Sequence, residues 1–197
     1  MRLLFLTVWL LIPLAFYAWH MGPGQHFSAV DQAGRATRLA QQLAGEGDHA
    51  GAADAYSDAL QHLPASSKLE AQKLRLERAK SQMLAKQLPA AHADMKQLID
   101  ELQADTQADQ GLLTEARSVA ANSQYYITWL MRLEGMGRDE WEPEIDAARA
   151  TYKLLAEQAQ DRGDSEQARK HQEDLESALR LARMDLGELQ GLPLPSQ

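Results

Sequence analysis

The sequence predicts an all-α protein in which about seven helices form antiparallel pairs, an α-solenoid, behind one apolar amino-terminal helix. Three observations support this fold class. After residue 28 the apolar residues recur every three or four positions, without the alternation of a strand. Short stretches rich in Gly, Pro and Asp separate the periodic segments. Alanine is frequent on the apolar faces, where a small side chain lets two helices approach closely.

The composition limits the classes of partner and chemistry. The 197 residues carry 20 Lys and Arg against 28 Asp and Glu, a net charge of −8 at pH 7. An acidic chain without a basic stripe argues against a nucleic-acid partner, because phosphate contacts need clustered cations. The absence of Cys excludes disulfides, thiolate zinc sites and cysteine nucleophiles.

Residues 1–20 are predicted to form a signal anchor or transmembrane helix. Residues 3–19 carry no charge, and this length is at the short end of the roughly 17–25 residues that span a bilayer. Arg2 favours a cytoplasmic amino terminus, which would place the body in the extracytoplasmic (periplasmic) space. The alternatives are a cleaved signal, which would leave a secreted protein, and a buried helix of a soluble protein. Residues 21–28, with Gly22-Pro23-Gly24, are predicted to be a linker.

The helical domain is expected over residues 29–189. Its first two helices should cover 29–45 and 49–62, joined by a turn at Gly47-Asp48. A third helix follows the capping residues Ser66 and Ser67. The fourth starts near Leu88-Pro89, because proline is tolerated in a first turn.

Three further helices complete the domain. The fifth is expected over about 110–134, and Glu142-Pro143-Glu144 should open the sixth. The seventh is expected as one long helix over 164–189, covering the end of the stack. Residues 190–197 form a flexible tail that is too short and Pro-rich to fold.

Residues 33–64 resemble one tetratricopeptide repeat, with Ala and Tyr at the small and aromatic positions and a closing Pro. A weaker copy covers 66–102, and the same order of small and aromatic residues recurs in the sixth helix, although the fifth is too long for the family's repeat. The residues expected to pack the repeats are Leu39, Ala40, Leu43, Ala52, Tyr56, Ala59, Pro64, Ala79, Ala91, Met95, Ala148 and Tyr152. The resemblance implies a scaffold that holds other proteins.

No spacing in the sequence indicates catalysis. The six His residues include no pair at the i, i+3 or i, i+4 spacing of a helical metal site. No nucleophile elbow or Gly-rich phosphate loop occurs. We therefore expect no enzyme activity, no cofactor and no metal.

Two charged clusters have structural explanations. The acidic run 139–146 fits the amino-terminal end of a helix, where the helix dipole favours carboxylates, better than a docking surface for a basic partner. The third helix carries a basic concentration of Arg75, Arg78 and Lys80 with Lys68 and Lys73. Glu70 and Glu77 are interleaved with them, so we expect pairing along one helix. The alternative is a clamp for a partner's terminal carboxylate, as in some tetratricopeptide proteins.

Aromatic residues concentrate between positions 125 and 152. One interpretation is that they form the core of the third helix pair. The other is a groove that binds a peptide, because Tyr, Trp and Arg dominate binding hot spots. The candidate partner-binding residues are Tyr125, Tyr126, Trp129, Arg132 and Trp141.

Together these features predict a membrane-tethered scaffold or adapter that docks another protein, in the assembly of an envelope complex. One alternative is an extracytoplasmic protein that binds a peptide or small ligand between the fifth and sixth helices. Another is a homo-oligomeric structural protein in which the last helix packs against its copy through an apolar stripe. That stripe comprises Leu175, Leu179, Ala182, Leu186 and Leu189.

Overall fold

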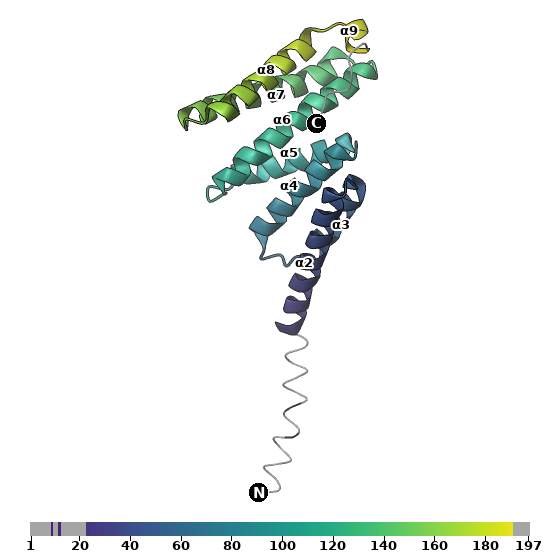
Figure 1. Ribbon diagram of the computed structural model, residues 1–197, viewed down its shortest axis with the longest axis vertical. Coiled ribbons are helices and arrows are strands. Elements are labelled where there is room, and N and C mark those ends of the chain that lie inside the picture. Colours follow the sequence, from purple (N-terminus) through teal and green to yellow (C-terminus); the bar gives the residue numbers. More distant parts are fainter. Residues whose placement is uncertain (1–8, 10–11, 13–22, 191–197) are drawn as a thin grey trace. The chain divides into compact units, whose positions relative to one another are not determined.

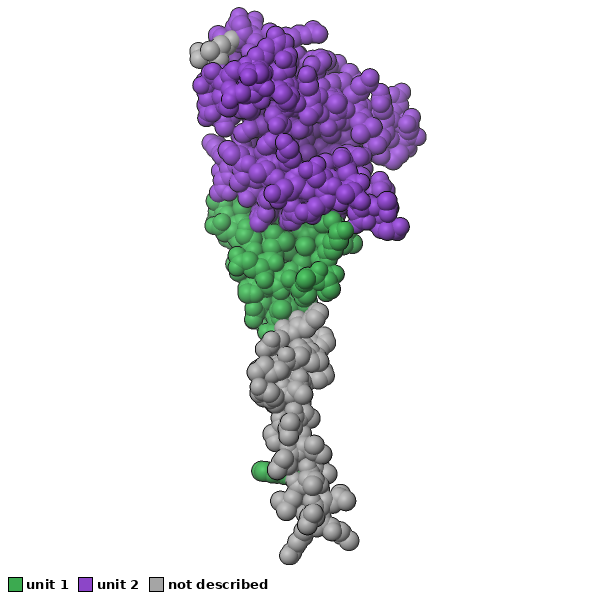
Figure 2. All heavy atoms as spheres, turned by 180° about the vertical axis from the view of Figure 1, so that it is seen from behind, with its two compact units in different colours: residues 1–74 green, residues 75–197 purple. Residues whose placement is uncertain are grey.

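The computed structural model describes residues 9, 12 and 23–190, and this part of the chain consists of helices and their connections. Figure 1 shows consecutive helices running back and forth, as expected for an all-α repeat-like protein. The chain divides into two compact units, residues 1–74 and 75–197 (Figure 2).

The described part of the first unit is a helical hairpin followed by the beginning of a third helix. Helix α2 (Pro23–Gly45) packs on α3 (His49–His62). Gly47 joins them at a positive φ of 84°, a conformation that glycine adopts without steric cost. The Asp48 carboxylate then caps α3 by accepting a hydrogen bond from the Gly51 N–H at 2.9 Å.

The core of this unit consists mostly of small side chains around one tyrosine. Tyr56 is 3% exposed and lies among alanines of both helices, with Leu74 from the beginning of α4 (Lys68–Leu84). The alanines let the helices approach, and the ring fills the space that remains. The buried members of this cluster are Ala36, Ala40, Ala55, Tyr56, Ala59 and Leu74.

The second unit contains the remainder of α4 and five further helices. They are α5 (Leu88–Ala104), α6 (Gln110–Leu133), α7 (Arg138–Asp161), α8 (Ser165–Arg183) and the short α9 (Leu186–Gln190). Each of α5, α6 and α7 packs on the next helix along the chain, and α9 returns to contact α6. Adjacent helices pack in this way because each hairpin turn is short.

Two apolar clusters form the core of this unit. The first lies between α4, α5 and α6, and its largest fully buried side chains are those of Leu76, Met95, Leu98 and Leu102. The second joins α6 to α9, with Ile145, Leu181 and Leu189 at its centre. The helices therefore share cores with their neighbours along the chain, as in a repeat stack.

Most of the expected helix bounds are observed, with three differences. Helix α2 begins at Pro23, so the predicted linker is helical from that residue, because the fixed φ and missing N–H of proline suit a first turn. Helix α7 begins at Arg138 and not at Glu142, because the Gly137 N–H donates to Glu140 Oε2 at 2.8 Å and sets an earlier start. Pro143 consequently lies inside α7.

The expected long final helix is interrupted at Met184. There the backbone is extended, with φ −57° and ψ 148°. Asp185 and Glu188 then exchange side-chain-to-backbone hydrogen bonds of 2.7 and 3.1 Å, a capping box that starts α9. The pattern Asp-Leu-Gly-Glu at 185–188 carries this signal in the sequence, and apolar periodicity alone did not reveal it.

The expected repeat-packing residues are buried with three exceptions. Leu43 and Pro64 are half-buried, and Leu39 is 50% exposed. Leu39 was expected to face the partner helix, but Ala36 and Ala40 occupy that face of α2. The remaining residues of the set are buried, from Ala40 through Tyr152.

The predicted anchor, residues 1–20, lies outside the described residues except for Trp9 and Ile12, as does the tail after Gln190. Among the helices that the structure describes, none is both long and apolar enough to span a membrane.

Candidate functional site

The two adjacent tyrosines of the candidate aromatic set lie on α6 and are half-buried. The rings of Tyr125 and Tyr126 meet edge to face, with centroids 5.4 Å apart and planes at 83°. Burial raises the pKa of both phenols. Tyr125 also packs on the second core cluster of unit 2, together with the half-buried Trp129.

Arg132, near the end of α6, and Trp141, near the start of α7, form a structural contact. The Trp141 side chain is buried, and the Arg132 guanidinium lies 4.8 Å from the centroid of its ring. The guanidinium also donates to the carbonyl oxygens of Leu181 and, at 2.5 Å, of Met184. A groove residue must present its ring to solvent, so we leave Trp141 out of the candidate site, and Arg132 with it.

The basic residues Arg75, Arg78 and Lys80 of α4 pair mainly with carboxylates of other helices. The expectation of pairing along their own helix is met by Lys80 and Glu77. Arg75 donates to Glu101 on α5 at 2.7 Å. Lys80 contacts Glu77 one turn away at 2.6 Å and Glu115 on α6 at 2.5 Å. Burial lowers the pKa of Lys80, but the hydrogen bonds to the two carboxylates outweigh it and the net shift is upward.

Arg78 completes this set of contacts through Asp94 on α5. Its Nε and one terminal nitrogen both donate to Asp94 Oδ2, at 2.9 and 2.5 Å. Both side chains are about four-fifths buried, with 20% and 18% exposed. Arg75, Arg78 and Lys80 therefore join α4 to its neighbours, and their charges are already compensated.

A cavity of about 400 Å³ opens on the side of unit 2 formed by α4, α6 and α8; we call it the α4–α6–α8 cavity. It is the place where one ring of the candidate aromatic set, that of Tyr126, lines an open space. The lining combines apolar and charged side chains, namely Lys80, Met83, Leu84, Val119, Asn122, Tyr126, Lys170 and Asp174.

Burial perturbs the titrating groups on the α8 side of this cavity. Burial raises the pKa of the Asp174 carboxyl, although His171 and Lys170 oppose the shift. Burial also lowers the pKa of His171, whose Nδ1 lies 3.7 Å from Asp174 Oδ2. On the α6 side, Asn122 Oδ1 accepts a 2.7 Å hydrogen bond from the Tyr152 hydroxyl, which fixes the amide at the cavity wall. Sequence reasoning missed Asn122, because a lone Asn within a helix carries no pattern.

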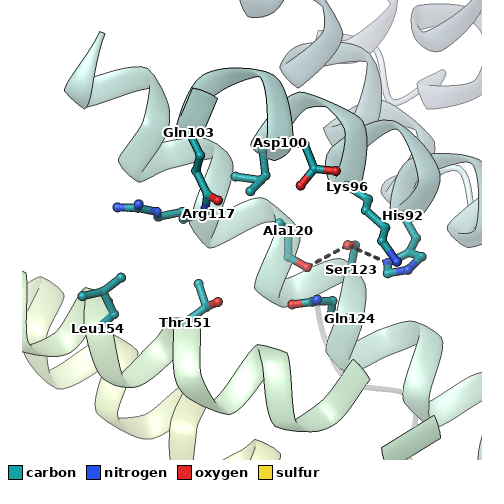
Figure 3. Close-up of a pocket in the computed structure, with 11 residues that line it drawn as sticks. His92, Lys96, Asp100, Gln103, Arg117, Ala120, Ser123, Gln124, Thr151 and Leu154 are labelled. Atoms are coloured by element: carbon teal, nitrogen blue, oxygen red, sulfur yellow. Dashed lines mark hydrogen bonds between the residues drawn. The ribbon is translucent and has the colours of Figure 1, made fainter. Parts of the chain in front are cut away.

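A second opening of about 290 Å³ lies between α5, α6 and α7; we call it the α5–α6–α7 cleft. In Figure 3 the α5 side chains project toward α7, and Thr151 and Leu154 project back from α7. Lys96 and Arg117 lie toward opposite ends of the opening in this view. The cleft corresponds to the place predicted for a small ligand, between the fifth and sixth expected helices, but polar side chains contribute much of its lining.

A chain of polar contacts closes one end of the cleft. His92 Nε2 lies 3.5 Å from Glu144 Oε1, and His92 Nδ1 lies 3.5 Å from the Ser123 hydroxyl. This order of carboxylate, imidazole and hydroxyl is that of a hydrolase triad, but Ser123 donates its proton to the Ala120 carbonyl at 2.7 Å. Ser123 also lies inside α6, where the backbone N–H groups are used by the helix and cannot form an oxyanion hole. The contacts therefore orient side chains and do not activate a nucleophile.

Metal binding has no support in the described residues, where no group of three or more His, Cys, Asp or Glu side chains could hold an ion. The His residues are dispersed along the chain, and His49 and His62, for example, lie at opposite ends of α3.

Comparison with known proteins identifies no relative: no protein-family model matches the chain, and no curated protein is significantly similar to it. The tetratricopeptide resemblance therefore depends on the sequence pattern alone. The consecutive packing of the helices is compatible with it.

Proposed function

We propose that this chain is a tetratricopeptide-like scaffold that docks an extended segment of another protein in the α4–α6–α8 cavity. In this proposal residues 1–20 tether the chain to a membrane and the body is extracytoplasmic. The tether would raise the effective concentration of a membrane-bound partner without any new contact. The observation that carries the proposal is a cavity of about 400 Å³ with an apolar wall and charged residues around it.

The position of the cavity supports a docking role. In a stack of antiparallel helix pairs, every second helix lies on the same side, and such a row makes an extended binding surface. Helices α4, α6 and α8 are every second helix of unit 2, and each contributes side chains to the cavity.

The chemistry of the lining fits a peptide segment with a central apolar side chain. Met83, Val119 and the Tyr126 ring provide apolar area, and Leu84 is an exposed leucine at 43%. The charged groups Lys170 and Asp174 can orient the polar backbone and neighbouring side chains of the segment. Tyr is a residue type that dominates binding hot spots.

The rival homo-oligomer loses much of its stripe within the fold. Leu189 is fully buried in the second core cluster of unit 2, and Leu175 and Ala182 pack against that cluster. The break at Met184 further divides the stripe between α8 and α9. We therefore favour a different protein as the partner.

Site-specific photo-crosslinking in living cells tests the proposal. A photoreactive residue at Leu84 of the full chain should give one discrete crosslinked product, because this exposed side chain lines the cavity. Lys170→Glu in the same chain should reduce the yield of that product.

The matched control places the photoreactive residue at Lys153, whose side chain on α7 is 70% exposed and does not line the cavity. Identical products from positions 84 and 153, or no product from position 84, would refute docking at this cavity. A product with the mass of two copies of the chain would instead support the homo-oligomer.

A further inference from the structure

The α5–α6–α7 cleft contains two cations that the fold leaves unpaired. Lys96 on α5 and Arg117 on α6 form no ion pair with any other residue in the described part of the chain. By contrast, Arg75, Arg78 and Lys80 are each paired with a carboxylate of a neighbouring helix. The lining of the cleft holds these two cations and one carboxylate, that of Asp100, so in a chain of net charge −8 this opening has a local excess of positive charge that can attract an anion.

The floor of the cleft is polar and held in place. Ser123 is 1% exposed, and its hydroxyl lies between the Ala120 carbonyl and His92 Nδ1. His92 is in turn next to the Glu144 carboxylate, which also accepts from Gln124 Nε2 at 3.4 Å. A bound molecule therefore meets side chains that are already oriented, which reduces the entropy lost on binding.

The remaining wall suits a short hydrocarbon body. Ile99 is half-buried and Leu154 is 38% exposed, so both can bury further against a ligand. Gln103 and Thr151 offer hydrogen-bonding groups at the same opening (Figure 3). The volume of about 290 Å³ is close to the lower limit of roughly 300–1,000 Å³ found for small-molecule sites.

We propose that the α5–α6–α7 cleft binds a small organic anion, whose carboxylate or phosphate group pairs with Lys96 or Arg117 and whose body contacts Ile99 and Leu154. This site goes beyond the docking function proposed above, because none of the residues that line one opening also lines the other. The Arg guanidinium suits the geometry of either anionic group, and the ammonium of Lys provides a point charge.

Asp100 gives the site a selective element. Its carboxylate lines the same cleft as the two cations, and it repels a second negative group on a ligand. It would accept a hydrogen bond from a ligand that carries an ammonium or hydroxyl group beside its anion. Glutamate should therefore depend on Asp100 in the opposite direction from succinate, which has no such donor.

Equilibrium dialysis of the full chain at low ionic strength tests this proposal with three labelled probes: succinate, glutamate and inorganic phosphate. We expect saturable binding of at least one probe. Replacing the cation that pairs with it, by Lys96→Gln or by Arg117→Gln, should raise its dissociation constant about tenfold, the effect of losing one charge-assisted hydrogen bond. Arg169→Gln is the matched control, because this residue lies on α8, its side chain is 68% exposed, and it does not line the cleft. It should leave the dissociation constant unchanged.

Asp100→Asn adds a test with a predicted sign. Removing this like charge should strengthen the binding of succinate and phosphate, and removing the negative charge that attracts an ammonium group should weaken the binding of glutamate. Comparing phosphate with the two carboxylates shows which anionic group the cleft prefers. The proposal is overturned if no probe binds saturably below about 10 mM. It is equally overturned if neither Lys96→Gln nor Arg117→Gln weakens binding more than Arg169→Gln does, since the anion would then sense only the net charge.

Discussion

Replacing Arg132 by Met should lower the free energy of unfolding of the second unit by about 2 kcal/mol. This value is smaller than the full strength of the contacts of Arg132, because the side chain is partly exposed. The guanidinium donates to the carbonyl oxygens of Leu181 and Met184, where α8 ends and the chain turns into α9. It also lies 4.8 Å from the centroid of the Trp141 ring. Methionine keeps the apolar part of the side chain and removes all three contacts.

The magnitude follows from these contacts. A hydrogen bond to a charged group contributes about 1.5–3 kcal/mol when well buried, and a cation–π contact at a partly exposed site contributes about 0.5–1 kcal/mol. Arg132 is only half-buried, and the released carbonyls regain water, so each term is reduced. Loss of about 2 kcal/mol corresponds to a decrease of about 1 M in the midpoint of urea unfolding.

The assay is urea unfolding followed by circular dichroism, with hydrogen exchange of residues 186–190 as a local probe. Arg138→Met is the matched control, because the Arg138 side chain is 74% exposed and pairs only with Glu142 along α7 among the described residues; it should not change the midpoint. If Arg132 acts by holding α9, its effect and that of Leu189→Ala must be less than additive, since Leu189 is the fully buried contact of α9. Full additivity, or unchanged exchange of 186–190 in Arg132→Met, would refute this explanation.

Two further predictions concern the core and pH. Ala148→Leu should destabilise the protein by about 1–3 kcal/mol through overpacking, because Ala148 is fully buried between helices. Ala150→Leu, on the exposed side of α7, should be near neutral. Equal urea midpoints of the two variants would contradict the role of alanine in helix packing. His171, whose pKa burial lowers, should make stability fall as the pH decreases below the ordinary value of 6.5, since the unfolded chain then binds a proton that the folded state disfavours. His171→Gln should therefore flatten the decrease in the urea midpoint between about pH 7.5 and pH 5, and an unchanged slope would exclude this residue as its source.

Much of the fold could be predicted from the sequence, because local signals and packing agree. The periodicity of the apolar residues and the turn at Gly47-Asp48 predict the first hairpin, and Gly47 adopts a positive φ. The alanines expected at close helix contacts are buried in both units. Two of the three boundary errors occur where side-chain-to-backbone hydrogen bonds decide a boundary, at Gly137 and Asp185, because such a bond can move a helix end without changing the apolar pattern.

The candidate site was harder to predict, because its residues come from helices that are distant in sequence. The aromatic set was chosen by residue type, but type does not indicate which rings the core uses. Trp141 packs inside the second core cluster of unit 2, whereas Tyr126 lines an open cavity. Asn122 lies one turn from Tyr126 on α6, whereas Lys170 and Asp174 on α8 reach the same cavity only through the packing of the helices.

The distribution of charge links the fold to both proposals. On α4, Arg75 directly precedes Leu76 and Arg78 directly precedes Ala79, and both Leu76 and Ala79 are buried in the core. Packing of these core residues places Arg75 and Arg78 beside the carboxylates of α5. A pair between half-buried groups on two helices limits their relative sliding, and it compensates the charge that a carboxylate clamp on α4 would need. Anion binding is therefore expected away from α4, at a place where cations form no ion pair in the described part of the chain. Lys96 and Arg117 are two such cations, and they line one cleft.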